Sequence, residues 1–287
     1  MAGIPDIKKD LPMAMTMAAF AGIAWYICFE LNIRLFLLFK RRKGLYFWSC
    51  VLCSWGVILQ PLFIIMADFG VWTNLKASIT LIYLSWWIMV IPQSLVLYSR
   101  LHLIMRDNKH LRWVLYMIIF NIIIFSIPTI ILGILAQATS HSPTLGPINL
   151  IWDRIQTTVF FLQETALSIL YIIQTRKHLK ASSLLNQDSL NGNDSSRQVL
   201  HQLIYINLLV IFLDITLLAI QYANFFYLQG AYKPCVYGVK LRVEFAILNR
   251  LISSIRGRGS GAGYSYSHGE GSGSHRHWAL MHRKQPS

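Results

Sequence analysis

Four carboxylic acids lie inside long apolar stretches of this chain, where a charge is costly unless it has a partner or a function. They are Glu30, Glu164, Asp214 and Glu244. Glu164 and Asp214 have no cation at helical spacing in their own stretch, and Glu244 lies at a similar depth in its stretch. We therefore expect these three acids to converge on one polar cavity, where an acid could donate a proton or bind a cation. A structural hydrogen-bond network between helices is the alternative.

Two further pairs of opposite charges have the four-residue spacing that places side chains on one face of a helix. Glu30 precedes Arg34, and Lys240 precedes Glu244, whereas Arg242 points away from the second pair. Each spacing predicts an ion pair within one helix, which lowers the cost of burying both charges. The sequence thus predicts a ligand site or polar network built from Gln93, Glu164, Asn207, Asp214, Lys240 and Glu244.

The stretches that carry these residues are long enough to cross a bilayer. Of the 287 residues, 55% are hydrophobic and 13% are charged, whereas soluble domains carry about 25% charged residues. A helical span needs roughly 20 apolar residues. Seven candidates meet this length, at 13–38, 44–67, 77–99, 111–136, 155–175, 200–223 and 233–255. The seventh holds three charges, so an amphipathic helix lying at the membrane surface is the alternative for it.

These spans predict an all-α, polytopic membrane protein with a seven-transmembrane-helix bundle. Residues 1–12 form a short N-terminal segment, 13–255 the membrane domain, and 256–287 a basic tail rich in Gly, Ser and His. Such a tail cannot bury a core, so we expect it to be disordered and to touch anionic lipid. RNA binding and metal binding by its histidines are alternatives.

The cations between the spans set the orientation, because Lys and Arg are enriched in cytoplasmic loops. Their numbers along the chain, from the N-terminus through six loops to the tail, are 2, 4, 1, 4, 1, 4, 1 and 5. This alternation predicts an outside N-terminus and a cytoplasmic C-terminus. The predicted cytoplasmic basic turns include Lys40, Arg41, Arg42, Lys43 and Arg100.

The net charge of +14 is explained by these loops, so we expect a lipid bilayer as partner and no nucleic acid. Cys50 and Cys53 form a CxxC inside an apolar stretch with no further ligand nearby, and we interpret them as small core residues. We expect no metal site and no cofactor. Prolines at 61, 92 and 128 predict irregular helices there.

Five sequence blocks carry a resemblance to a known family. They are FKRRKGLYFWS, QSLVLYSRLHLI, RWVLYMIIFNIIIFSIPT, IQTTVFFLQE and VKLRVEFAILN. From about residue 16 to 255 the chain resembles a family of fungal seven-helix integral membrane proteins catalogued as a domain of unknown function. The resemblance implies the seven-helix fold and a topology like that of fungal heptahelical receptors. It implies no activity, because the role of that family is not established.

We predict a receptor-like or sensor-like protein of the plasma membrane or an endomembrane, with a small or lipidic ligand and a cytoplasmic signalling partner. The sequence favours a non-enzyme. The alternative is a membrane-embedded terpene cyclase, or an accessory membrane protein of a fungal secondary-metabolite pathway. In the cyclase, Glu164, Asp214 or Glu244 would donate the proton that starts a carbocation. Aromatic rings would stabilise the cation, with candidates at Trp86, Trp87, Phe160, Phe161, Phe212, Tyr222 and Phe245.

Overall fold

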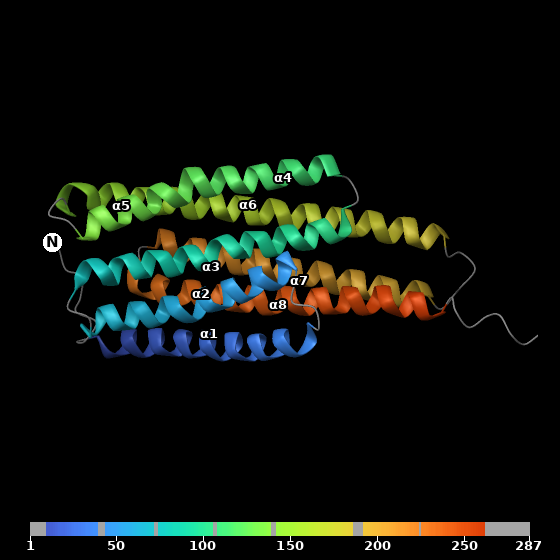
Figure 1. Cartoon of the computed structure of the whole chain (residues 1–287), viewed down its shortest axis with the longest axis horizontal. Coiled ribbons are helices and arrows are strands. Elements are labelled where there is room, and N and C mark those ends of the chain that lie inside the picture. Colours follow the sequence, from blue (N-terminus) through green and yellow to red (C-terminus); the bar gives the residue numbers. More distant parts are fainter. Residues whose placement is uncertain are drawn as a thin grey trace, which may run out of the picture. The chain divides into compact units, whose positions relative to one another are not determined.

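A computed structural model describes residues 10–39, 44–71, 74–105, 108–138, 142–185, 192–223 and 225–261 (Figure 1). The described residues are helical apart from short connections, so the all-α prediction is confirmed. In chain order the helices are α1 (Leu11–Leu38), α2 (Leu45–Asp68), α3 (Leu75–Ile104), α4 (Asn108–Asn121), η1 (Ile122–Ser126), α5 (Ile127–Ala138), α6 (Ser142–Leu185), α7 (Gly192–Tyr222) and α8 (Phe226–Gly261). Because α4, η1 and α5 follow one another without a break, the described residues make seven helical segments.

Six of these segments are long and apolar enough to cross a membrane. Within the described ranges they are Leu11–Leu38, Leu45–Asp68, Lys76–His102, Lys109–Ala136, Leu145–Lys177 and His201–Tyr222. Each overlaps one of the first six predicted spans. Large apolar side chains cover their outward faces, as at Phe29, Trp113, Phe120 and Phe212, all more than half exposed. Such continuous apolar surface is stable against lipid and not against water, so the chain is a multi-pass membrane protein.

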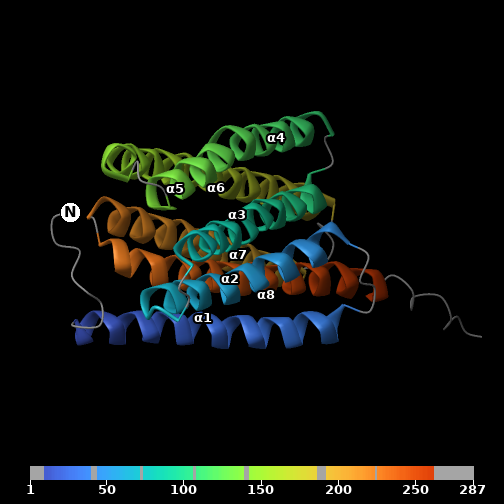
Figure 2. The same cartoon turned by 60° about the vertical axis from the view of Figure 1, so that its left-hand side comes forward.

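The seventh predicted span corresponds to α8, which is too polar to count among those six. In both views α8 runs between α1 and α7 (Figures 1 and 2). Its Val236 and Tyr237 pack in one buried cluster with Ala24 of α1, Val57 of α2 and other core residues. Helix α8 therefore packs against other helices of the bundle along this stretch. Lys233, Lys240 and Glu244 of α8 are buried within the protein, which shields these charges from lipid.

Contacts between α2 and α3 bring their backbones together. A Cβ atom built on Gly56 would lie 2.6 Å from the backbone nitrogen of Met89 and 2.9 Å from the carbonyl carbon of Ile88. Only glycine permits this approach, which small residues commonly provide in membrane helices. The thiol of Cys53, three residues earlier, donates to the carbonyl of Met89 across 3.3 Å. Cys50 and Cys53 are free and fully buried, as predicted for core residues.

The helix from Asn108 to Ala138 contains one turn of π-helix, η1, directly before Pro128. Proline lacks the N–H that the carbonyl four residues earlier would accept, and its ring crowds that carbonyl, so a proline inside a helix favours a local irregularity such as a π-helical turn. The irregularity predicted at Pro128 is present, whereas α2 and α3 stay helical through Pro61 and Pro92. Phe125 of η1 stacks on Trp152 of α6, with ring centroids 6.0 Å apart.

Several helices extend beyond the predicted spans. Helix α6 covers Ser142–Leu185, where the prediction was 155–175, and α7 begins at Gly192, inside the predicted polar loop. Hydropathy marks where a helix enters lipid, but helical hydrogen bonding continues into water. Residues 186–191 lie outside the described part of the chain.

By contact clustering the chain divides into two compact units, Met1–Leu248 and Asn249–Ser287. The first unit contains the packed helices. In the second, the described residues end with α8 at Gly261, inside the predicted tail segment 256–287. The remainder of the predicted tail, with its histidines, and the basic turn Lys40, Arg41, Arg42 and Lys43 lie outside the described residues.

Candidate functional site

Lys240 lies at the junction of three helices. Its side chain is 1% exposed, and its ammonium donates to Glu164 Oε2 of α6 across 2.6 Å and to Asp214 Oδ1 of α7. The structure thus brings together two of the three acids that the sequence placed at similar depth. Burial of all three side chains leaves this ion-pair triad, Glu164–Asp214–Lys240, without competition from bulk water.

Glu244 has different partners, although it follows Lys240 by one helical turn. The amide of Gln93 on α3 donates to Glu244 Oε1 across 2.9 Å, and Nη1 of Arg100 lies 3.9 Å from the same oxygen. The predicted Lys240–Glu244 pair within α8 is therefore wrong. The spacing does place both residues on one face, but Lys240 reaches toward α6 and α7, whereas Glu244 meets α3.

Arg100 belongs to this interior group and not to a solvated cytoplasmic turn. Its side chain is 2% exposed, and its guanidinium carbon lies 4.5 Å from the centroid of the Tyr171 ring. None of its three nitrogens has a hydrogen-bond partner among the described residues. The prediction that placed Arg100 with the basic turns is corrected here. The sequence does indicate this position, because Arg100 follows Gln93 by seven residues, a spacing that places both side chains on the same face of a helix.

A third polar cluster, which the sequence reasoning missed, surrounds Asp153 of α6. Asp153 Oδ2 accepts from the amide of Gln221 across 2.6 Å and from that of Gln229 across 3.4 Å. The ammonium of Lys233 lies 3.8 Å from Asp153 Oδ1. Lys233 is buried on α8. The signal was the recurrence of Gln229 and Lys233 on the helical face that also carries Lys240 and Glu244.

The amide residues divide between this network and separate contacts. Asn207 is buried and donates to the carbonyl of Leu203 in its own helix across 2.7 Å. Asn121 of α4 donates to Gln163 of α6 across 2.6 Å, and Gln163 donates to Ser94 of α3 across 3.1 Å. These two hydrogen bonds join α3, α4 and α6.

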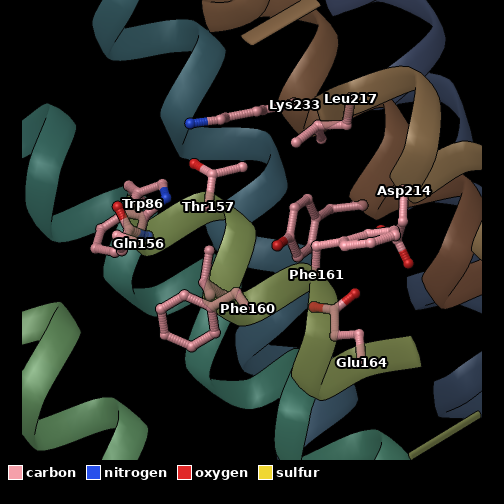
Figure 3. A pocket seen from close by; sticks show the side chains of 11 residues that line it. Trp86, Gln156, Thr157, Phe160, Phe161, Glu164, Asp214, Leu217 and Lys233 are labelled. Atoms are coloured by element: carbon pink, nitrogen blue, oxygen red, sulfur yellow. The ribbon is translucent and has the colours of Figure 1, made fainter. Parts of the chain in front are cut away.

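A small cavity borders the triad (Figure 3). It is lined by Trp86, Val90, Gln156, Thr157, Phe160, Phe161, Glu164, Asp214, Leu217, Lys233 and Tyr237. Its volume is about 20 Å³, which is room for one or two water-sized species. In Figure 3 the carboxylates of Glu164 and Asp214 lie on the same side of the cavity, close to the ring of Phe161.

Both acids keep one oxygen free of protein partners. Glu164 Oε1 and Asp214 Oδ2 are buried and without a hydrogen-bond partner in the described residues, as is Gln156 Oε1 on the same wall. All three are acceptors. Buried acceptors are normally satisfied by a donor.

Glu30 connects two helices at the periphery. Arg34 Nη2 lies 2.7 Å from Glu30 Oε1, which confirms the ion pair predicted within α1. Arg242 of α8 donates to the same oxygen across 3.0 Å. Both arginines are substantially exposed, so this contact joins α1 to α8 without contributing to the interior network.

Within the described residues, no group of three or more His, Cys, Asp or Glu is placed to hold a metal ion. Comparison with curated proteins and with solved structures finds no match. One family model, described as a domain of unknown function, matches residues 7–262, which is most of the chain. The chain therefore belongs to the family described as domain of unknown function DUF7703.

Proposed function

We propose that this protein is a receptor-like membrane protein that binds a small ligand in the cavity beside Lys240 and reports occupancy through α8. The observation that carries the proposal is that the buried Lys240 of α8 forms ion pairs with acids of two other helices, Glu164 of α6 and Asp214 of α7. A ligand that binds Glu164 or Asp214 competes with Lys240 for the same carboxylates. It therefore favours a state in which α8 is held less tightly to α6 and α7.

The receptor-like topology is part of the proposal. In this proposal α8 is the seventh span. The N-terminus of the chain lies outside and its C-terminus lies in the cytoplasm, in keeping with the alternating loop cations. The basic first turn, Lys40 to Lys43, then faces the cytoplasm together with the end of α8. A cytoplasmic signalling partner with an acidic surface would meet these cations. The plasma membrane and an endomembrane both fit this arrangement.

The size of the cavity favours a small ligand over a lipidic one. At about 20 Å³ it cannot enclose an acyl or isoprenoid chain, since pockets for drug-sized ligands measure roughly 300–1,000 Å³. A larger ligand would enter only after the helices separate.

A terpene cyclase is the second candidate, and one observation favours it. Buried acids and aromatic rings share a cavity, with Glu164 and Asp214 near Trp86, Phe160 and Phe161. Two features weigh against it: the cavity volume, and the use of one oxygen of each acid by the ammonium of Lys240. Product analysis after incubation with an isoprenoid epoxide separates the two. A cyclised product that disappears in Asp214→Asn would overturn the receptor proposal.

The proposed link between the cavity and α8 is tested by removing the ion pairs of Lys240. Spin labels at two lipid-facing positions, Ala246 of α8 and Trp113 of α4, report the distance between these helices in nanodiscs. We expect Lys240→Met to broaden this distance distribution or shift it by several ångströms, because α8 loses both ion pairs. The matched control is Arg34→Met, which removes an exposed peripheral cation. An unchanged distribution in Lys240→Met would show that the triad does not hold α8 in place.

A further inference from the structure

We propose that the cavity is a binding site for a compact monovalent cation, of the size of ammonium, methylammonium or an alkali-metal ion. This inference rests on the proposed function for the location of the site, but not on signalling through α8. It follows from the charge balance around Lys240, from the unpartnered oxygens in the cavity wall, and from the size and aromatic lining of the cavity.

The charge balance leaves one negative charge in excess at the cavity. Lys240 is shared by two carboxylates, Glu164 and Asp214. The other buried charges of the described core occur in matched pairs, since Glu244 lies near Arg100 and Lys233 near Asp153. These pairs are neutral and cannot compensate the triad. An uncompensated buried carboxylate is strongly unfavourable, so a cation is the species that the site lacks.

The cavity-lining oxygens without hydrogen-bond partners also indicate a cation. Lys240 uses one oxygen of each acid, and the second oxygens, Glu164 Oε1 and Asp214 Oδ2, have no partner among the described residues. Gln156 Oε1 adds a neutral acceptor. Carboxylate and amide oxygens are the groups that hold hard cations and N–H donors.

Size and lining restrict the cation further. The volume of about 20 Å³ suits a species near the size of water. A divalent ion would exceed the single excess charge. Trp86, Phe160, Phe161 and Tyr237 line the cavity together with the acids, and aromatic rings attract weakly hydrated monovalent cations and ammonium groups. Lys240 itself uses this effect, with its ammonium 4.8 Å from the centroid of the Tyr237 ring.

The experiment measures thermal unfolding of the full chain in nanodiscs, followed by tryptophan fluorescence at fixed pH and fixed ionic strength. The salts compared are the chlorides of sodium, potassium, ammonium and methylammonium, with N-methyl-D-glucamine chloride as the bulky reference. We expect at least one compact cation to raise the melting temperature saturably, by roughly 5 °C at a hundredfold excess over its dissociation constant. Equal curves in all five salts would overturn the proposal. A dependence on pH alone would also overturn it, because a proton would then supply the missing charge.

Substitutions of the two acids and the lysine test whether the cation binds in this cavity. Asp214→Asn and Glu164→Gln should each abolish the cation-dependent shift, because each removes the excess charge. Lys240→Met should strengthen cation binding by about tenfold or more, since it removes a positive charge from the same two carboxylates. The matched control is Glu30→Gln, which neutralises an acid outside the cavity and should keep the wild-type shift. A shift that survives in both Asp214→Asn and Glu164→Gln would place the cation elsewhere and overturn the proposal. If one acid variant does not fold, the other and the salt series on the wild type still decide.

The outcome is separable from that of the proposed function. Saturable binding of a cation without movement between the labels on Ala246 and Trp113 would uphold the cation site and reject signalling through α8. Movement of α8 in Lys240→Met without any selectivity among cations would support signalling through α8 and reject the cation site.

Discussion

The ammonium of Lys240 lies 2.6 Å from Glu164 Oε2, although the two residues are 76 positions apart in the chain. Their helices, α8 and α6, are joined further by Lys233 and Asp153, 3.8 Å apart. These two contacts lie on one face of α8, two turns apart. A helix that is too polar for lipid is thus held in the bundle by charges that would be unstable anywhere else in the membrane.

Removal of the lysine charge should destabilise the fold strongly. Lys240→Met leaves two buried carboxylates without a cation, and breaking a buried pair from one side costs about 3–5 kcal/mol. The measurement is chemical denaturation of the purified protein in mild detergent. Arg34→Met provides the comparison, because its partner contact is exposed and should change stability by less than about 1 kcal/mol.

The triple variant Lys240→Met, Glu164→Leu, Asp214→Leu tests the reason for that loss. It removes the unpaired charges together with the lysine, so stability should recover by at least about 2 kcal/mol relative to Lys240→Met alone. No recovery would indicate that packing of the lysine side chain, and not charge compensation, holds the three helices together.

The contact between α2 and α3 predicts a steric effect at Gly56. Gly56→Ala places a methyl group against the backbone of Met89, which a side-chain rotation cannot relieve. We expect a loss of about 1–3 kcal/mol, seen as a lower melting temperature in detergent. Gly22→Ala on α1 is the matched control, since a Cβ there meets nothing within 4 Å. Equal effects of the two substitutions would contradict the close approach of the backbones.

Gln93 is the hydrogen-bond donor that holds Glu244. Gln93→Leu removes the 2.9 Å bond and should destabilise the protein by about 1–3 kcal/mol, because a buried carboxylate loses its donor. In a double-mutant cycle with Glu244→Gln the two effects should not add, since both act on one contact. Additive effects would mean that the two side chains do not interact in the native state.

The four cysteines offer a test of the packing around α2. All are free and buried, at Cys28, Cys50, Cys53 and Cys235. A membrane-impermeant maleimide should therefore label the native protein at none of these four sites, and all four after denaturation in detergent. Mass spectrometry gives the number of adducts. Rapid labelling of native Cys53 would show that water reaches the space between α2 and α3.

The orientation is a prediction from the loop cations alone. A fluorescent protein fused after Ser287 should be protected from protease added to intact cells, because the C-terminus is expected on the cytoplasmic side. An epitope placed before Met1 should be reachable from the opposite side of the membrane. Digestion of the C-terminal fusion in intact cells would invert the proposed topology.

The sequence alone determined that the chain is helical and resides in a membrane. Hydropathy is a local property, so runs of roughly 20 apolar residues are visible without any tertiary information, and all six apolar spans were identified in this way. The pair of Glu30 with Arg34 was equally visible, because both side chains lie on one turn of one helix.

The choice of partner for each interior charge was decided only by the tertiary structure. Lys240 and Glu244 have the spacing of a helical pair, yet each bonds to a different neighbouring helix. Arg100 lies near the end of an apolar stretch, as loop cations do, yet it is buried against Tyr171. Spacing along one helix fixes which face a side chain occupies. Which helix meets that face depends on the packing of the whole bundle. The distances between side chains of different helices cannot be read from the order of residues in the sequence.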